Sequence, residues 1–104
     1  MKHTFWTAYS NKNRILTISE IEKMVSVYGY ITDFKQYSDI SIMIKIEIEE
    51  LKIDNLYNDL SKYINLDNIE QLSSSSNKER IIYLNITFTT GTGDVRIEVP
   101  AIPG

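Results

Sequence analysis

The chain has 104 residues, of which 42% are hydrophobic and 24% charged, so the sequence predicts one ordinary globular domain and is too short for two. Its net charge of −3 argues against sequence-independent binding to DNA or RNA, which needs clustered lysine and arginine, and suits a basic partner instead. The absence of cysteine excludes disulfides, thiolate catalysis and every cysteine-based metal site.

The first expected elements are a strand and a helix. Residues 4–9 mix aromatic residues with threonine, which is typical of a strand. Thr17 and Glu20 then have the spacing of a capping box, and Gly29 can supply the left-handed residue that ends a helix. The sequence therefore predicts a helix over residues 18–28. Its apolar positions repeat at helical spacing: Ile18, Ile21, Val25 and Tyr28.

A hairpin is expected next, with strands over residues 30–37 and 40–48. In the second of these strands isoleucine occupies every other position, and the positions between hold Met43 and polar or charged residues. Because side chains alternate between the two faces of a strand, this pattern predicts one buried face. The other face is expected to be solvated or only partly covered.

The second half of the chain is predicted to add a helix and two strands. Helical spacing returns over residues 54–64, where Asn65 is expected to end the helix in the left-handed conformation. Residues 66–72 are ambiguous and could form another helical turn. Four serines and Asn77, over residues 73–77, predict a flexible surface loop. A strand over 81–89, a turn over 91–94 and a strand over 95–99 complete the chain.

The resulting order, β-α-β-β-α-β-β, resembles the ferredoxin-like superfold. We therefore expect a single α+β domain over residues 1–104, with a split β-α-β-β-α-β arrangement and an added C-terminal strand. The sheet is expected to be antiparallel, with both helices on one face. The resemblance implies no function, because this superfold hosts many unrelated ones.

Side chains that carry chemistry are scarce in this sequence. His3 is the single histidine and stands at a terminus, where it is expected to be an exposed bystander. Glu47 and Glu49 share one strand face about 6–7 Å apart, a spacing that would suit paired carboxylates or a cation site. On an exposed strand face, however, such carboxylates are expected to be solvated. The sequence predicts no catalytic residue, no cofactor and no metal site, and hence no enzyme.

Aromatic residues on the helix-free sheet face are the candidate interaction surface. Phe5 and Trp6 are adjacent in a strand and must point to opposite faces, with Tyr9 on the side of Phe5. The open face therefore receives either Trp6 or the pair of Phe5 and Tyr9, and Met43 and Tyr83 are expected to join it. An apolar patch of this kind marks a binding surface or a dimer interface. The alternative is that the serine loop or the C-terminal tail covers it.

The RNA-recognition motif shares the predicted element order and stacks bases on aromatics of its first and third strands. Here the third strand offers no aromatic residue and two acids, so no nucleic-acid partner is expected.

No apolar run approaches the roughly 18 residues of a membrane span, and no signal-like apolar segment follows Met1. We therefore expect a cytoplasmic protein without a membrane partner. The sequence is rich in isoleucine, asparagine and lysine, which are encoded by AT-rich codons. This composition favours a low-GC bacterial genome as the source.

These features favour a non-enzymatic protein-interaction module that acts through the open sheet face. It would either self-associate, as a homodimer, or neutralise a basic partner, as a small acidic immunity protein or antitoxin does. The alternative is a small-molecule-binding or regulatory domain, with its ligand at a dimer interface or under the serine loop. Arg14, Arg80 and Arg96 would then be candidate anion anchors.

Overall fold

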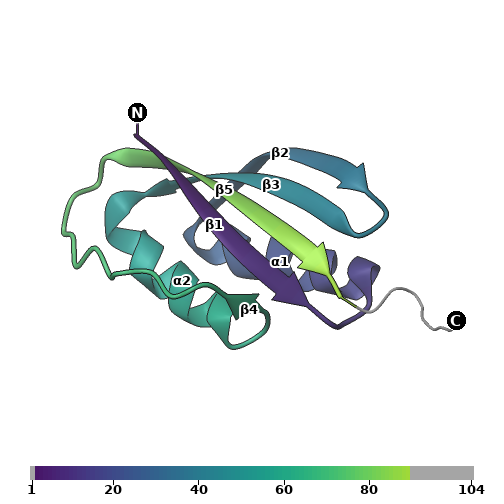
Figure 1. Cartoon of the computed structure of the whole chain (residues 1–104). Helices are drawn as coiled ribbons and strands as arrows, with labels where there is room; N and C mark the ends of the chain where they lie inside the picture. Colours follow the sequence, from purple (N-terminus) through teal and green to yellow (C-terminus); the bar gives the residue numbers. More distant parts are fainter. Residues whose placement is uncertain (1, 90–104) are drawn as a thin grey trace, which may run out of the picture.

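The computed structural model describes residues 2–89, which form a five-stranded sheet with two helices packed on one of its faces (Figure 1). The strands are β1 (Lys2–Ser10), β2 (Gly29–Ser38), β3 (Ser41–Glu49), β4 (Asn65–Leu66) and β5 (Glu79–Phe88). The helices are α1 (Arg14–Tyr28) and α2 (Ile53–Ser61), and a 3-10 turn, η1 (Glu50–Lys52), precedes α2. The α+β class and the two-layer arrangement agree with the sequence pattern. Neither helix of this described part is long and apolar enough to cross a membrane.

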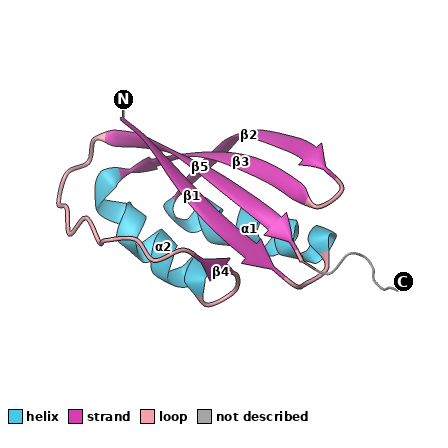
Figure 2. Ribbon diagram, in the orientation of Figure 1, coloured by secondary structure: helices cyan, strands magenta, loops and turns pink. Residues whose placement is uncertain are grey.

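The sheet is mixed, with strand order β2-β3-β5-β1-β4 (Figure 2). β1 and β5 pair in parallel, whereas the other neighbours pair antiparallel. The prediction of a wholly antiparallel sheet is therefore wrong, and the ferredoxin-like order is not confirmed. The physical reason lies in the connection after β3. η1 and α2 carry the chain back along the sheet, and residues 67–78 return it, so that β5 starts beside the end of β3 and runs parallel to β1.

β5 lies inside the sheet and has partners on both sides. Residues 79–87 pair with β3, and residues 80–88 pair with β1. The turn expected at 91–94 and the strand expected at 95–99 lie outside the described residues. Within the described part, neither edge of β5 is free to pair with a hairpin partner that follows it.

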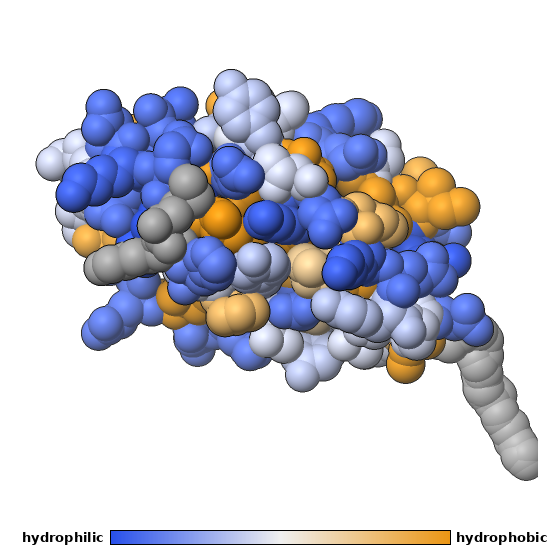
Figure 3. Space-filling model, turned by 90° about the horizontal axis from the view of Figure 1, so that it is seen from above, coloured by the Kyte–Doolittle hydropathy of each residue, from blue (hydrophilic) through white to orange (hydrophobic). Residues whose placement is uncertain are grey.

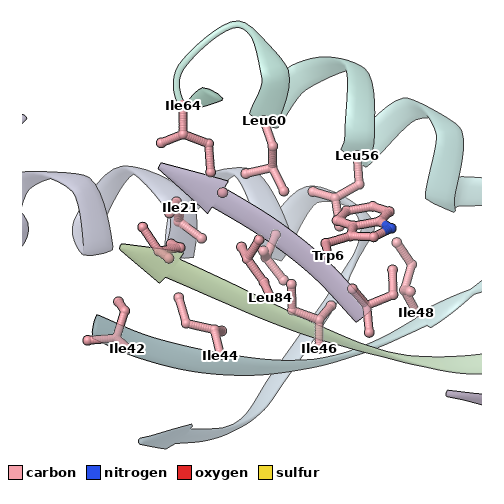
Figure 4. Packing of buried hydrophobic residues seen from close by; sticks show 14 of the residues in the cluster. Trp6, Ile21, Ile42, Ile44, Ile46, Ile48, Leu56, Leu60, Ile64 and Leu84 are labelled. Carbon is pink, nitrogen blue, oxygen red and sulfur yellow. The ribbon is translucent and has the colours of Figure 1, made fainter. Parts of the chain in front are cut away.

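The isoleucine row of β3 forms the centre of the core, as the alternation predicts. Its helix-facing members are Ile42, Ile44, Ile46 and Ile48, each at most 1% exposed (Figure 4). Ile40, which the prediction included, precedes the strand and is 47% exposed. The neighbouring strands add Trp6, Ala8, Ile82, Leu84, Ile86 and Phe88, and the helices add Ile21, Val25, Ile53, Leu56 and Leu60.

Helix α1 begins four residues earlier than the sequence pattern indicated. Asn13 is its N-cap and accepts a hydrogen bond from the Leu16 amide at 3.1 Å. Thr17 lies inside the helix, buried, where its hydroxyl donates to the Asn13 carbonyl at 2.8 Å. The predicted capping box is therefore wrong, because a stronger capping residue stands one turn before it.

Gly29 does not adopt the left-handed conformation expected of a helix-ending glycine. It has φ −163° and ψ −149°, which is extended backbone, and it begins β2. A Cβ atom at this position would lie 2.5 Å from the Glu47 carbonyl oxygen and 3.0 Å from Cβ of Ile48. Glycine is therefore needed here for the close approach of β2 to β3.

The segment after α2 also differs from the prediction. α2 ends at Ser61. Asn65 lies in β4, where it pairs with Tyr9 of β1, and its backbone conformation is not left-handed. Residues 67–72 form no helical turn. The serine segment lies on the surface, as expected, and backbone and side-chain hydrogen bonds attach it to η1 and α2. These bonds are Leu51 N to Ser76 O (2.9 Å), Ser73 N to Asp54 Oδ2 (2.8 Å) and Ser74 Oγ to Glu50 Oε1 (2.6 Å).

Candidate functional site

The face of the sheet opposite the helices, called the open face below, is the candidate site. Strand alternation and register place side chains of β1, β2, β3 and β5 on it, in rows that cross the sheet. Figure 3 shows the molecule from above the view of Figure 1, where hydrophobic areas lie between hydrophilic ones. The members are His3, Phe5, Thr7 and Tyr9 from β1, Glu79, Ile81, Tyr83, Asn85 and Thr87 from β5, Ser41, Met43, Lys45, Glu47 and Glu49 from β3, and Tyr30, Asp33, Lys35 and Ser38 from β2.

An aromatic cluster stands at the β1–β5 side of this face. Phe5 and Tyr83 are register partners, and their rings stack with centroids 5.1 Å apart and planes inclined by 17°. The rings of His3 and Tyr83 form a T-shaped pair with centroids 5.6 Å apart. The Phe5 side is open to solvent, since this residue is 69% exposed. The parallel pairing of β1 with β5 creates the cluster, because it places residues 78 positions apart side by side.

Met43 and Ile81 form a less accessible part of the same face. Both are 8% exposed, although neither α1 nor α2 covers them. Lys35 and Asn85 flank Met43 on the adjoining strands, just as His3 and Glu47 flank Ile81. Buried apolar side chains thus lie between longer polar side chains on the open face. Phe5, near the centre of β1, is a more exposed apolar group of the same face.

Four of the five residues predicted for the interaction surface lie on this face, and one does not. Phe5, Tyr9, Met43 and Tyr83 are on the open side, with Tyr9 about 13 Å along β1 from Phe5. Trp6 is 1% exposed in the core, where its ring and that of Tyr57 form a T-shaped pair with centroids 5.4 Å apart. Figure 4 shows its indole beside Leu56 of α2. The alternative that sequence left open is therefore resolved in favour of the Phe5–Tyr9 side.

Two further rings belong to this face, although the sequence pattern did not place them there. His3, which was expected to be a bystander, contacts Tyr83. Tyr30 lies opposite Glu47 in the β2–β3 pairing and is 73% exposed. The sequence pattern did not indicate on which face of the sheet Tyr30 lies, because β2 lacks a regular alternation and contains two register shifts.

The charges of the open face are predominantly acidic at one end. Glu47, Glu49 and Glu79 lie there, with Glu49 opposite Glu79 in the register. A surface cavity of about 270 Å³ is lined by these three residues, by Tyr30 and Lys52, and by the C-terminal end of α1. Lys52 pairs with Glu49 at 3.2 Å. No group of three or more histidine, aspartate or glutamate side chains in the described part of the chain is arranged to hold a metal ion.

A second, smaller cavity of about 60 Å³ lies beside β1 under residues 69–72. Its apolar walls include Trp6 and Tyr57, and Arg80 contributes a charged group. The Arg80 guanidinium bonds Glu50 Oε2 at 2.8 Å and reaches Thr4 Oγ1 at 3.4 Å, whereas its buried Nε has no hydrogen-bond partner. Of the other expected anion anchors, Arg14 donates to the Asp39 carbonyl at 2.7 Å and Arg96 lies outside the described residues.

Comparisons of this chain with protein-family models, curated proteins and solved structures find no match. Exposed rings on a rigid sheet, next to carboxylates, are suited to noncovalent recognition of an apolar and positively charged surface.

Proposed function

We propose that this chain is a non-enzymatic protein-interaction module that binds a basic protein partner through the open face. The observation that carries the proposal is the stack of Phe5 on Tyr83. The ring of Phe5 remains accessible while Tyr83, half-buried in the central strand, holds its orientation. An aromatic side chain that is ordered before binding loses little conformational entropy in the complex and can serve as an anchor.

The acidic end of the face gives the partner its expected charge. Glu47 lies in the same row across the sheet as Ile81 and His3, next to the row of Phe5 and Tyr83. A lysine or arginine of the partner could contact the rings and a carboxylate together. The net charge of −3 would also speed association with a positive surface. A small immunity protein or antitoxin that neutralises a basic protein in the bacterial cytoplasm would work in this way.

A defined peptide probe tests this proposal. An arginine-rich peptide that carries one tryptophan would be titrated into the labelled protein, and amide chemical shifts would map the contact. We expect the largest shifts along β1, β5 and β3 on the open face, and weaker binding at higher salt. The double variant Phe5→Ser/Tyr83→Ser should lose most of the binding, and Glu47→Lys should weaken it.

The matched control is Ile15→Ser/Val27→Ser, which removes two exposed apolar side chains of α1 (74% and 70% exposed). This variant should bind like the wild type. Shifts confined to the helix side, or equal loss of binding in both double variants, would sink the proposal. Sedimentation of the same variants without peptide decides whether the open face instead binds a second copy of the chain.

The cavity at Arg80 favours a second candidate function, a small-molecule-binding domain. The unpartnered Nε needs an acceptor, and the walls of Trp6 and Tyr57 suit an apolar body. Glu50 already neutralises Arg80, and Asp54 and Glu70 also line the cavity, so a neutral ligand with a carbonyl or hydroxyl oxygen fits better than an anion. A thermal-shift screen tests this candidate, since a ligand raises the melting temperature. No shift with small amides or alcohols would count against it.

A further inference from the structure

The outer edge of β2 is unpaired in the described part of the chain. β2 is the first strand in the sheet order and pairs with β3 on one side (Figure 1). Every side chain from residue 32 to residue 38 is exposed. A long edge strand presents backbone N–H and C=O groups that can pair with another strand.

The sequence of β2 is complementary to itself when it is read in the antiparallel direction. If two copies pair about Phe34, Asp33 of one copy lies opposite Lys35 of the other, and this happens twice by symmetry. The next pairs outward match Thr32 with Gln36, both polar. The β2–β3 register places Asp33 beside Lys45 and Lys35 beside Met43, so both charges lie on the open face. The two opposite charges would therefore meet on one side of the combined sheet.

We propose that β2 pairs with β2 of a second copy of this chain, about a two-fold axis at Phe34. Phe34 faces the helix side, opposite Ile44, and is 43% exposed, so the two Phe34 rings would cover each other across the axis. The sheets of the two copies would become continuous, and both open faces would lie on the same side. The dimer would then present two copies of the Phe5–Tyr83 cluster to a partner at once. This pairing does not depend on the function proposed for that cluster.

Features of β2 confine the pairing to its middle. Register shifts between Ile31 and Asp33 and between Gln36 and Ser38 interrupt the strand at both ends. In the single chain, Asp33 Oδ1 accepts the Phe34 amide at 2.8 Å, which satisfies one group of the edge. Bulges and charges of this kind protect edges from indiscriminate association. In the dimer, the Asp33 carboxylate would pair with Lys35 of the second copy instead of with the Phe34 amide of its own chain. The ladder is short, so we expect dimerisation that depends on protein concentration.

Charge exchange at the two positions is the test, with sedimentation equilibrium as the readout. The single variants Asp33→Lys and Lys35→Asp should each weaken self-association about tenfold or more, because like charges then face each other twice. The double variant Asp33→Lys/Lys35→Asp should restore it. A mixture of the two single variants should form a heterodimer, since all facing charges are then opposite. Circular dichroism confirms that each variant is folded.

Asp67→Lys and Lys62→Asp are matched controls, because both side chains are exposed and lie away from β2. They should leave association unchanged. Phe5→Ser/Tyr83→Ser should also leave it unchanged, which separates this inference from the function proposed for the open face. A wild-type chain that stays monomeric up to millimolar concentration would overturn the proposal. Single variants that associate like the wild type, or a mixture that does not associate, would overturn it as well.

Discussion

Phe5 and Tyr83 stack face to face on the open side of the sheet, with ring centroids 5.1 Å apart. The next residue in the chain, Trp6, points to the other side and is buried under the helices. Two adjacent aromatic side chains thus serve different purposes, one on the surface and one in the core. Substitutions at the two positions should therefore lower the free energy of unfolding by different amounts.

Replacing Trp6 by alanine should lower the free energy of unfolding by about 3–5 kcal/mol, because the change leaves a large cavity among Leu56, Tyr57 and the strands. Phe5→Ala should cost no more than about 1 kcal/mol, since it removes one exposed cross-strand contact. Urea unfolding followed by circular dichroism measures both values. Equal losses in the two variants would contradict the assignment of the faces.

Gly29→Ala should destabilise the protein by about 1–3 kcal/mol, because the new methyl group would overlap the Glu47 carbonyl oxygen of β3. The backbone atom cannot rotate away, so the end of the β2–β3 hairpin has to shift. Tyr30→Ala removes a 73% exposed side chain next to it and serves as the control. Thermal unfolding of both variants decides the matter, and an unchanged melting temperature for Gly29→Ala would show that β2 can move aside at no cost.

Tyr28→Phe should lower stability at neutral pH, because the Tyr28 hydroxyl donates to Asp59 Oδ2 at 2.5 Å and so joins α1 to α2. The hydrogen bond to Asp59, followed by burial and the charge of Asp59, raises the pKa of Tyr28 above its ordinary value of 10.0. The folded state therefore holds this proton more tightly than the unfolded state. The resulting stabilisation is present below pH 10 and is lost as the pH rises through the raised pKa.

We therefore expect the stability difference between the wild type and Tyr28→Phe to shrink above pH 10. Unfolding curves at neutral and alkaline pH measure it, and absorbance of ionised tyrosine shows when the hydroxyl titrates. A difference that grows with alkaline pH would contradict the hydrogen bond as described.

Arg80→Met should lower the free energy of unfolding by about 1–3 kcal/mol, since Arg80 and Glu50 are both mostly buried and their ion pair links β5 to η1. Glu50 also accepts from Ser74, so the serine segment should become easier to open. Hydrogen exchange of the amides of Ser73 and Ser76 reports this opening. Lys23→Met, which removes the exposed pair with Glu20, is the control and should change little. Slow exchange retained at both amides in Arg80→Met would show that the pair does not hold the segment.

Much of the secondary structure could be predicted because it follows from local patterns. Alternating isoleucine marked the buried face of β3, and helical spacing located both helices to within a few residues. Helix ends were less predictable. The Thr17 hydroxyl can cap a helix or bond a carbonyl inside one, and the choice depended on Asn13 standing one turn earlier. The reason for glycine at position 29 was likewise invisible, because it lies in the approach of Glu47 from another strand.

The sequence by itself determined that Phe5 and Trp6 would lie on opposite faces, because adjacent side chains of a strand alternate. It also determined which side of β3 would be buried. Only the tertiary structure decided that Trp6 belongs to the core and that Phe5 meets Tyr83. That choice depends on the placement of β5 between β3 and β1, parallel to β1. Strand order is set by non-local pairing and by the path of residues 67–78 along α2, and no local pattern of residues records it.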